Sequence, residues 1–495
     1  MRLKDLLEEL EYECVGGEPD REVGRLVYDS RKLEKDCVFV CISGANFDGH
    51  SKAYEACKKG AAAIITEKET EVCPGCDTAI IRTPDTRRAL ALLSAAYFGH
   101  PSRSLRVIGI TGTKGKTTTT YLIKSMLEQT GLKVGLIGTI EAIIGDEHIP
   151  ALNTTPESFV IQEYFKRMVD AGIQAVVMEV SSQGLMMKRT DGIEFELGIF
   201  TNIEPDHIGP NEHRDFDDYL RCKSLLFRQC RTGILNADSE HVKDILKGHT
   251  CKVETYGIEG EADIKAVNIN YVNQPGVLGV EFDTKGLTEL HAFVPTPGLF
   301  SVYNALCAIA VCRHFNITGS EVEKALSTVH VRGRIEPVRI SDSFTLIIDY
   351  AHNAMALKSL LSTLKAYSPR RLVCLFGCGG NRARSRRFEM GEVSGRLADL
   401  TVITSDNPRF EEPLDIIADI RTGIDRTGGR YVEIPDRGEA VKYVIENAES
   451  GDVIVLAGKG HEDYQEIKGV KYHMDERELI MNAVKELNLE KGCAL

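Results

Sequence analysis

The chain of 495 residues lacks any apolar run that approaches the ~18–20 residues needed to cross a lipid bilayer. Its first residues, MRLKDLLEELEYE, are too acidic and amphipathic for a secretory signal peptide. Low-complexity tracts and short-period repeats are also missing from the sequence. These absences argue against membrane-spanning and repeat architectures, and they predict a soluble protein of the cytoplasm.

An excess of basic residues is missing as well. The chain has 60 Lys and Arg against 73 Asp and Glu, which gives a formal net charge of −13. Non-specific binding to nucleic acid or to an anionic membrane surface needs a basic face. The charge balance therefore predicts neither nucleic acid nor membrane as a partner.

The fourteen cysteines are scattered, and several of them, such as Cys307, Cys312 and Cys374, lie inside apolar runs. Free thiols in a reducing compartment behave in this way, as small buried hydrophobic groups. One CxxC motif occurs, from Cys73 to Cys76, but no second CxxC or paired His completes a zinc site. A surface turn is the favoured interpretation of this motif, and a redox or metal role is the alternative.

The length predicts about three domains, and 43% apolar with 27% charged residues is typical of globular protein. A proline after His100 and the junction VRGRIEPV suggest boundaries that give domains 1–102, 103–333 and 334–495. Apolar strands alternate with helical stretches throughout. We therefore predict an α/β fold: a small α/β N-terminal domain, a central mostly parallel sheet with an antiparallel addition at 251–294, and a C-terminal doubly wound sheet.

A glycine-containing loop follows the apolar strand LRVIGI and precedes a helix. Glycines let backbone N–H groups face a phosphate, the start of the helix adds positive potential, and Lys116 can reach the β- and γ-phosphates. Thr117 offers a hydroxyl to Mg²⁺. The loop is shorter than the usual phosphate loop, because Ile110 stands at the outer glycine position. The residues expected to contact ATP here are Gly112, Thr113, Lys114, Gly115, Lys116, Thr117 and Thr118.

Acidic and imidazole side chains follow neighbouring strands. Glu179 ends the buried strand AVVMEV, and Asp206 and His207 follow the strand LGIFTNI. A carboxylate at the end of a buried strand is unfavourable unless it meets a cation, and Mg²⁺ beside the phosphate loop would supply one. The alternatives are a capping or turn carboxylate for Glu179 and an ordinary hydrogen-bonded histidine for His207.

The order of these motifs resembles the Mur ligases, the ATP-dependent enzymes that build the peptide of bacterial peptidoglycan. The segments GTKGKTTT, MEVSS, TNIEPDHI, YLRCKSLLF, YNALCAIA, GRIE and DYAHN carry this resemblance. The segments DSRKLEKDCVFVCISGANFDGH, NTTPES, GCGGNR, SDNPRFEEP and LAGKGHEDYQ are similar to the MurE type, which adds a diamino acid as the third residue. The resemblance covers essentially the whole chain.

The resemblance implies an ATP- and Mg²⁺-dependent ligase that acts on UDP-N-acetylmuramoyl-L-alanyl-D-glutamate. ATP would phosphorylate the D-glutamyl carboxylate, and the amine of a diamino acid would attack the acyl phosphate. The expected partners are these small molecules, and the expected oligomeric state is a monomer. A folylpolyglutamate synthetase-like ligase and a non-catalytic nucleotide-binding paralogue remain as rivals, and a dehydrogenase is disfavoured because the dinucleotide fingerprint is incomplete.

The resemblance also implies roles for single residues. The catalytic and metal-binding set would be Lys116, Thr117, Glu179, His207 and Lys223, the last as a carbamate formed with CO₂. Further ATP contacts would come from Asn304, Arg334, Asp349 and His352. Without the resemblance, Lys223 would be an exposed helix lysine, and Arg334 with Asp349 would form an ion pair between packed domains.

Two other groups of residues match substrate contacts of the family. For the UDP-sugar dipeptide they are Ser30, Asp48, Gly49, His50, Asn153, Thr154, Thr155, Ser181 and Arg189. For diaminopimelate they are Arg382, Asp406, Asn407, Pro408, Arg409, Gly458 and Glu462. From the residues alone, NTTP would be a turn, and the arginines from 382 to 387 would form a solvated basic helix face.

The motif DNPR favours meso-diaminopimelate as the added amino acid. A guanidinium binds a carboxylate with two hydrogen bonds, and L-lysine has no distal carboxylate to offer Arg409. The segment from Ile208 to His213 is closer to lysine-adding relatives, so lysine or another diamino acid is the alternative. Met187, Asn381 and Ala354 also depart from the usual pattern. The 208–213 segment and Met187 lie in the central domain and bear on the dipeptide contacts, and they leave the residues expected to select the amino acid unchanged.

Overall fold

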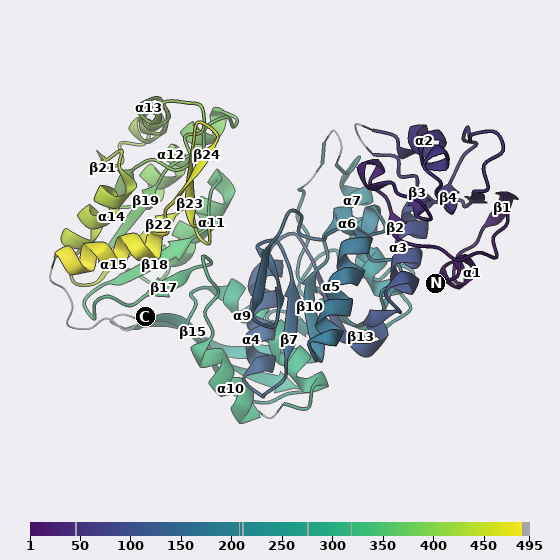
Figure 1. The fold of residues 1–495 in the computed structure, drawn as a ribbon. Coiled ribbons are helices and arrows are strands. Elements are labelled where there is room, and N and C mark those ends of the chain that lie inside the picture. The colour runs from purple at the N-terminus through teal and green to yellow at the C-terminus, as the bar shows by residue number, and fades with distance from the viewer. Residues whose placement is uncertain (45–46, 207, 210–211, 275–276, 318, 488–495) are drawn as a thin grey trace. The chain divides into compact units, whose positions relative to one another are not determined.

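The computed structural model describes residues 1–44, 47–206, 208–209, 212–274, 277–317 and 319–487 (Figure 1). The chain divides into two compact units. The first comprises Met1–Ile264 with Cys307–Ile317, and the second comprises Lys265–Leu306 with Thr318–Leu495. No helix within the described residues has both the length and the apolar character needed to span a membrane.

The first unit begins with a five-stranded sheet in the order β1-β5-β4-β3-β2. Neighbouring strands are parallel, except that β1 is antiparallel to β5. Alternate residues of the strands contribute to two separate hydrophobic clusters, one with α1 and α3 and one with α2. The elements are α1 (Leu3–Leu6), β1 (Glu13–Gly16), β2 (Leu26–Val27), η1 (Ser30–Lys32), β3 (Val38–Val40), η2 (Gly49–Lys52), α2 (Ala53–Lys58), β4 (Ala63–Thr66), β5 (Ala79–Arg82) and α3 (Thr86–Tyr97).

A larger mixed sheet follows, with eleven strands in the order β16-β15-β14-β13-β12-β11-β6-β10-β7-β8-β9. The strands β12, β11, β6, β10 and β7 are mutually parallel, so their carboxyl ends lie at one edge. The elements that the first unit contributes are η3 (Pro101–Ser104), β6 (Arg106–Thr111), α4 (Lys116–Glu128), β7 (Val134–Ile137), β8 (Glu141–Ile144), β9 (Glu147–Pro150), α5 (Ser158–Asp170), β10 (Ala175–Glu179), α6 (Ser182–Met186), β11 (Phe195–Phe200), α7 (Phe216–Ser224), η4 (Leu225–Arg228), β12 (Cys230–Asn236), α8 (Val242–Ile245) and β13 (Lys252–Gly257).

The expectation of an antiparallel addition at 251–294 is wrong for the first strand of this region. The strand β13 pairs in parallel with β12, because α8 forms the crossover that a parallel connection needs. Antiparallel pairing is observed between β15 and β16, within the second unit. A further antiparallel hairpin, β8 with β9, follows β7 and was not expected from the sequence.

The second unit contains a six-stranded sheet in the order β17-β18-β22-β19-β20-β21. All neighbours are parallel except β17, and β22 returns between β18 and β19, which makes a doubly wound sheet with a switch in strand order. Hydrophobic clusters cover both faces. The remaining elements are β14 (Ile264–Gln274), β15 (Val277–Gly286), β16 (His291–Val294), α9 (Leu299–His314), α10 (Gly319–Thr328), β17 (Glu336–Val338), β18 (Thr345–Asp349), α11 (Ala354–Lys365), β19 (Arg371–Phe376), α12 (Ser385–Leu397), β20 (Leu400–Ile403), α13 (Pro413–Asp425), β21 (Tyr431–Glu433), α14 (Arg437–Glu446), β22 (Asp452–Ala457), β23 (Tyr464–Ile467), β24 (Val470–His473) and α15 (Glu476–Glu486).

The three-domain α/β architecture expected from the sequence is confirmed: the five-, eleven- and six-stranded sheets follow one another along the chain, and a two-stranded sheet, β23 with β24, lies near the end of the C-terminal region. The turn η3 separates α3 from β6, close to the first expected boundary. The exact boundaries at 102/103 and 333/334 stay predictions.

Candidate active site

The phosphate loop lies between the end of β6 and the start of α4, in the expected strand–loop–helix arrangement. Gly112 has a φ of +154°, and a Cβ there would lie 2.0 Å from Thr201 Oγ1. Gly115 is the N-cap of α4, with a φ of +85° in the left-handed region. Both positions require glycine, because a side chain would be strained in this backbone, and at Gly112 it would also collide with Thr201, just after β11.

Two lysine side chains of the first unit converge on one carbonyl of this loop. Lys116 Nζ donates to Gly112 O at 2.9 Å and to Thr113 O at 3.2 Å. Lys223 Nζ donates to the same Gly112 O at 2.8 Å. The loop therefore gathers two amines at the point where it turns into α4.

Lys223 is only 1% exposed, so the interpretation as an exposed helix lysine is wrong. Its Nζ lies 4.4 Å from the centre of the Tyr219 ring, on the same helix α7. Burial, and next the nearby charge of Lys116, hold the pKa of the Lys223 amine well below its usual value. The side chain is thus biased toward the neutral amine, which is the nucleophilic form.

Glu179 is fully buried at the end of β10, where it pairs in register with Ile110 of β6. Its carboxylate accepts from Thr117 Oγ1 at 3.1 Å, from Thr139 Oγ1 at 2.9 Å and from Thr139 N at 2.9 Å. The structure brings Glu179 and Thr117 together, and a carboxylate beside a hydroxyl is the oxygen donor set that Mg²⁺ prefers. These residues fit a magnesium ion.

Two further residues expected in this part of the site, Lys114 and Asp206, lie in more exposed positions. Lys114 Nζ pairs with Glu204 at 2.6 Å, and the side chain of Lys114 is partly exposed. Asp206 is exposed at the end of the segment that follows β11. His207 lies outside the described residues.

The NTTP segment packs beside Glu179. Thr155 Oγ1 donates to Glu179 O at 3.0 Å and lies 3.2 Å from Ser181 Oγ. Arg189 donates from Nη1 to Thr155 O at 2.9 Å, and Thr154 Oγ1 lies 3.1 Å from Thr139 Oγ1. Asn153 is exposed. The segment bends beside Glu179, and it places threonine hydroxyls, together with the guanidinium of Arg189, next to this residue.

His213, in the segment where the sequence departs from the usual pattern, is buried. Its Nε2 lies 2.9 Å from Ser182 Oγ, and its Nδ1 lies 3.4 Å from Asp218 Oδ2. The histidine thereby connects the start of α6 to α7, the helix that carries Lys223. Sequence reasoning gave it no role, because its partners are 31 and 5 residues away and form no motif.

The N-terminal domain contains a cavity of about 660 Å³ that brings Ser30 and Gly49 together. Asp48 caps η2 and accepts from Lys68 Nζ at 2.6 Å and from His50 Nδ1 at 2.7 Å. Lys68, and next His50, hold the pKa of the Asp48 carboxyl well below its usual value. Sequence reasoning missed most of the aromatic and charged lining of this cavity, which comprises Tyr28, Asp29, Ser30, Arg31, Phe39, Ile42, Phe47, Gly49, Lys52, Glu55 and Lys59.

In the second unit, the ends of β20 and β22 carry the residues expected to bind the amino acid. The two strands flank β19, so their carboxyl ends share one edge. Asn407 Nδ2 donates to Glu462 Oε2 at 3.0 Å, and this bond joins the two loops. A Cβ at Gly458 would lie 2.9 Å from Asp406 Oδ2, so only glycine allows this approach. The structure thus brings the two predicted loops together.

Two arginines border the same small region of this edge. A Cβ at Gly379 would lie 3.5 Å from Arg409 Nη1 and 4.0 Å from Arg382 Cγ. Arg409 donates from Nε to Glu466 Oε2 at 3.0 Å and from Nη1 to Gly380 O at 2.8 Å. A Cβ at Gly380 would lie only 2.0 Å from Pro408 O, which explains the glycine loop that precedes Arg382.

One arginine further along this segment, Arg387, serves packing. Arg387 is buried and pairs with Asp419 at 3.1 Å and with Glu411 at 2.8 Å. Arg384 also pairs with Asp419, at 2.7 Å. The interpretation of the cluster as a solvated basic face is therefore wrong for Arg387, which joins α12 to α13.

Lys459 is a residue of this pocket to which sequence reasoning assigned no role. Its side chain is fully buried, and Nζ donates to Asn407 Oδ1 at 2.8 Å and to Glu462 Oε2 at 3.1 Å. The lysine neutralises Glu462 and fixes the orientation of the Asn407 amide. The only feature of the sequence that could have indicated a role for Lys459 is its position between two glycines directly after a buried strand.

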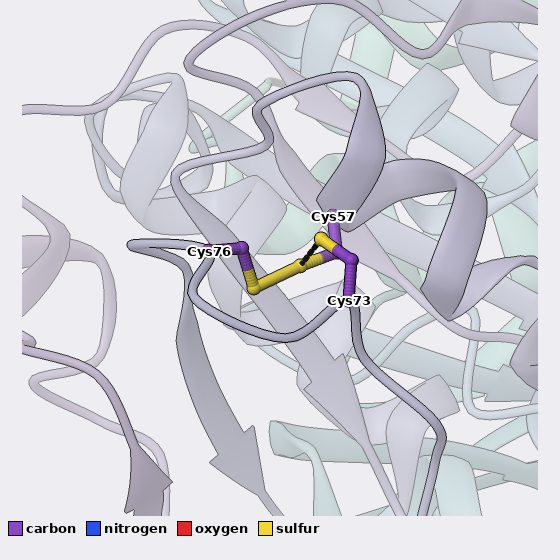
Figure 2. A group of neighbouring side chains, drawn as sticks. All are labelled: Cys57, Cys73 and Cys76. Atoms are coloured by element: carbon purple, nitrogen blue, oxygen red, sulfur yellow. Dashed lines mark hydrogen bonds between the residues drawn. A yellow bond between two sulfur atoms is a disulfide. The ribbon is translucent and has the colours of Figure 1, made fainter.

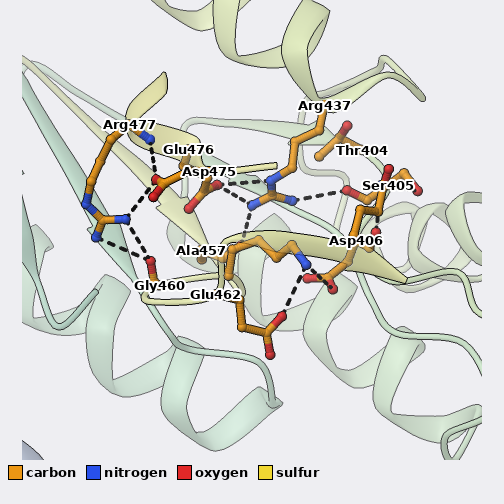
Figure 3. Close-up of polar contacts among 12 residues, drawn as sticks. Thr404, Ser405, Asp406, Arg437, Ala457, Gly460, Glu462, Asp475, Glu476 and Arg477 are labelled. Atoms are coloured by element: carbon orange, nitrogen blue, oxygen red, sulfur yellow. Dashed lines mark hydrogen bonds and ion pairs between the residues drawn. The ribbon is translucent and has the colours of Figure 1, made fainter. Parts of the chain in front are cut away.

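A second group that the sequence did not predict lies behind the two pocket loops and contacts their backbone. Arg437 donates from Nη1 to Ser405 O at 3.1 Å and from Nη2 to Ala457 O at 3.1 Å, the residues that precede Asp406 and Gly458 (Figure 3). It also donates to Glu476 Oε1 at 2.6 Å. Burial raises the pKa of the Glu476 carboxyl, and Arg437 opposes this shift. The buried pair holds the two pocket loops at a fixed separation.

The remaining residues expected near ATP also belong to the second unit. Asp349 is buried and accepts from Ile335 N and Ala351 N, each at 2.8 Å. Burial raises the pKa of the Asp349 carboxyl, and the charge of Arg334 opposes this shift. Arg334 Cζ lies 4.9 Å from the centre of the Tyr350 ring.

Among the described residues, no ion pair within 4.0 Å joins Arg334 to Asp349, so the direct ion pair inferred from the residues alone is wrong. His352 is exposed beside the Tyr350 ring, and Asn304 is buried on α9.

Comparisons with known proteins agree with this architecture. Residues 22–98 match the Mur ligase family catalytic domain, residues 110–312 the Mur ligase middle domain, and residues 333–460 the Mur ligase glutamate ligase domain. The UDP-N-acetylmuramoyl-L-alanyl-D-glutamate–2,6-diaminopimelate ligase of Clostridium perfringens (strain 13 / Type A) is 42% identical over 98% of this chain and 100% of its own length. The enzyme of the same name from Caldanaerobacter subterraneus subsp. tengcongensis is 41% identical over 98% of this chain and 99% of its own length.

A solved structure of a ligase of that name, 28% identical in sequence, superimposes with a TM-score of 0.75 and covers 99% of both chains. The three matched domains, the phosphate loop before α4 and the full-length relatives together show that the chain belongs to the Mur ligase family and is of the MurE type.

Proposed function

We propose that the protein adds meso-diaminopimelate to UDP-N-acetylmuramoyl-L-alanyl-D-glutamate, with hydrolysis of ATP to ADP, in peptidoglycan synthesis. One observation carries this assignment in the structure. The loops after β20 and β22 meet through Asn407 and Glu462, with Arg409 and Arg382 beside them. Full-length relatives that are named for the same reaction support it.

The phosphate loop would hold ATP through its backbone N–H groups, the start of α4 and Lys116. Thr117 and Glu179 would hold Mg²⁺, which neutralises phosphate charge when it is bound. We propose His207 as a further metal ligand. We propose Asn304, Arg334, Asp349 and His352 as further nucleotide contacts.

Lys223 is proposed to become a carbamate. Its low pKa favours the neutral amine, whose nitrogen attacks CO₂ and then loses one proton, so that the side chain ends as N–COO⁻. The product is an anionic oxygen donor in place of a buried cation. Such a group beside Gly112 would help to hold a metal ion near the phosphates.

The nucleotide-sugar is proposed to bind in the cavity of the N-terminal domain. Aromatic side chains such as Tyr28 and Phe47 offer surfaces for a base, and Arg31 and Lys52 offer charges for a diphosphate. Asp48 would order the turn that carries Gly49 and His50. The dipeptide would contact Asn153, Thr154, Thr155, Ser181 and Arg189.

The amino acid would bind at the carboxyl edge of the C-terminal sheet. Arg409 and Arg382 would receive its carboxylates, and Glu462 would receive an ammonium group. A substrate carboxylate that binds Arg409 must exchange with Glu466, its present partner. Lysine lacks the distal carboxylate and would leave Arg409 without this contact, so the site should select diaminopimelate.

The test compares meso-diaminopimelate with L-lysine as acceptor, with mass spectrometry of the UDP-tripeptide as the readout. We expect the diaminopimelate product, and phosphate release that requires both the UDP-dipeptide and the amino acid. A predominant lysine product would overturn the specificity. Phosphate release that is indifferent to both substrates would overturn the ligase assignment itself.

The remaining proposals concern organisation. We propose a cytoplasmic monomer with a UDP-sugar-binding domain at 1–102, an ATP-binding domain at 103–333 and an amino-acid-binding domain at 334–495. Sedimentation velocity and limited proteolysis test the oligomeric state and the boundaries.

A further inference from the structure

Three cysteines meet in the N-terminal domain. Cys57 lies in α2, and Cys73 and Cys76 belong to the loop between β4 and β5 (Figure 2). The structure joins Cys57 to Cys76 by a disulfide, and Cys73 Sγ lies 2.8 Å from Cys57 Sγ. All three sulfurs lie within 4.8 Å of one another. The CxxC motif thus has a third sulfur, which comes from a separate helix.

The three positions differ in access to solvent. Cys57 is buried, whereas Cys73 and Cys76 are half-buried on a turn whose central residues, Pro74 and Gly75, are exposed. The turn is tight, because Cys76 N donates to Cys73 O at 3.3 Å. One fixed sulfur from a helix and two sulfurs from a short exposed turn are a common arrangement in thiolate metal sites.

The other cysteines indicate the redox state in which this group works. Eleven cysteines are free within the described residues, and one of them, Cys14, is exposed. A chain that keeps so many thiols unpaired is typical of a reducing compartment. Under such conditions a dithiol or phosphine reductant opens the Cys57–Cys76 disulfide, and the cluster then presents three thiols.

We propose that the reduced cluster of Cys57, Cys73 and Cys76 binds one Zn²⁺ ion. Three thiols and one hydrated Zn²⁺ give a complex of three thiolates, one metal ion and one water, with release of three protons. The complex carries one negative charge. Thiolates are soft ligands that select zinc over magnesium or calcium.

The geometry requires only a small adjustment. Zn–S bonds of about 2.3 Å place the sulfurs of a tetrahedral site about 3.8 Å apart. The sulfurs of the disulfide must therefore separate, and the turn between Cys73 and Cys76, whose central residues are exposed, would supply this movement. Within the described part of the chain, no fourth Cys, His, Asp or Glu joins the group, which leaves the fourth position to water.

The bound ion would fasten the loop between β4 and β5 to α2. This helix begins directly after η2, which carries Gly49 and His50. The site would therefore stabilise the N-terminal domain beside the cavity described above. This inference does not depend on the proposed ligase reaction.

The experiment measures metal content in the full-length chain. The protein is purified with a phosphine reductant, incubated with Zn²⁺, dialysed and analysed by mass spectrometry for metals. We expect about one equivalent of zinc in the wild type and in the Cys14→Ser control, and at least a tenfold loss in Cys73→Ser. With Co²⁺ in place of zinc, the wild type should show a thiolate-to-metal charge-transfer band, and Cys73→Ser should not.

The Cys73→Ser variant separates the two states of the cluster, because the disulfide uses Cys57 and Cys76 only. Cys73 is half-buried, whereas Cys57 is buried within the hydrophobic cluster, so Cys73→Ser should disturb folding less than Cys57→Ser. Equal zinc in Cys73→Ser and wild type would overturn the proposal. So would a Cys57–Cys76 linkage that persists in peptide mass maps under the reductant, without bound zinc.

Discussion

Two arginine–glutamate pairs lie at the carboxyl edge of the C-terminal sheet, and they differ in their access to water. Arg409 and Glu466 are 23% and 24% exposed in their side chains, with an N···O distance of 3.0 Å. Arg437 and Glu476 are 1% and 0% exposed, at 2.6 Å. The first pair can exchange partners with a substrate, whereas the second cannot reach one. Within one pocket, the comparison therefore assigns the proposed substrate contact to Arg409 and the positioning of the two loops to Arg437.

The largest expected effect comes from breaking the buried pair. Arg437→Met leaves the Glu476 carboxylate buried without its partner, which should lower the free energy of unfolding by about 3–5 kcal/mol. Urea unfolding measures it. Arg409→Met is the matched control in the half-exposed pair, and it should lose less than about 1 kcal/mol. Equal losses in the two variants would contradict the distinction.

The double variant Arg437→Met/Glu476→Leu sharpens the same test. It replaces both charges by apolar groups and should recover most of the stability. The bridge between Ser405 O and Ala457 O is not restored, so KM for diaminopimelate should stay raised while kcat changes less. A full recovery of KM would limit Arg437 to a role in stability.

The second effect concerns the half-exposed pair and its substrate. Arg409→Lys loses a bidentate contact with a carboxylate, so kcat/KM for diaminopimelate should fall about 30–100-fold, equivalent to about 2–3 kcal/mol. Activity with lysine should change little. Arg384→Lys, at the start of α12 and paired with Asp419, is the control and should behave like the wild type. Equal losses with both amino acids would contradict the contact.

The third effect is a dependence on pH. The folded-state pKa of Glu476 is raised, so the folded chain binds this proton more tightly than the unfolded chain. Its contribution to stability is fully present below the unfolded pKa of about 4.3 and declines as pH rises toward the folded pKa. Glu476→Gln should remove this decline. Urea unfolding across this range measures it, and identical pH profiles would refute the assignment.

The smallest effect is expected at Glu466. Glu466→Gln removes the carboxylate that competes for Arg409, so KM for diaminopimelate should fall by less than about threefold, with kcat unchanged. Steady-state kinetics measure it. A large rise in KM would instead identify Glu466 as a direct contact of the substrate.

The sequence predicted those features that depend on local pattern. Strands, loops and helices around Gly112, Glu179 and Asp406 follow from apolar runs and glycines, and sheet topology then brings the strand ends together. The burial of Lys223 could not be predicted from its helix alone, because it depends on the distant carbonyl of Gly112. Only the resemblance to Mur ligases indicated its role.

Contacts between distant segments were missed for the same reason. Arg437 and Glu476 are 39 residues apart, and Cys57 is 19 residues from Cys76, without a motif that links either pair. The parallel pairing of β13 was missed because the short helix α8 gave little sign of a crossover. The packing of Arg387 against Asp419 likewise needs the position of α13.

The carbonyl of Gly112 accepts from both Lys116 and Lys223. A phosphate that binds either amine, or the conversion of Lys223 to a carbamate, would therefore displace a contact that the protein makes with itself. Nucleotide binding then becomes an exchange of partners, and its affinity reflects the difference between two hydrogen bonds instead of the full strength of one. If the loop binds nucleotide as proposed, this single oxygen atom would tune how readily the site loads and releases it.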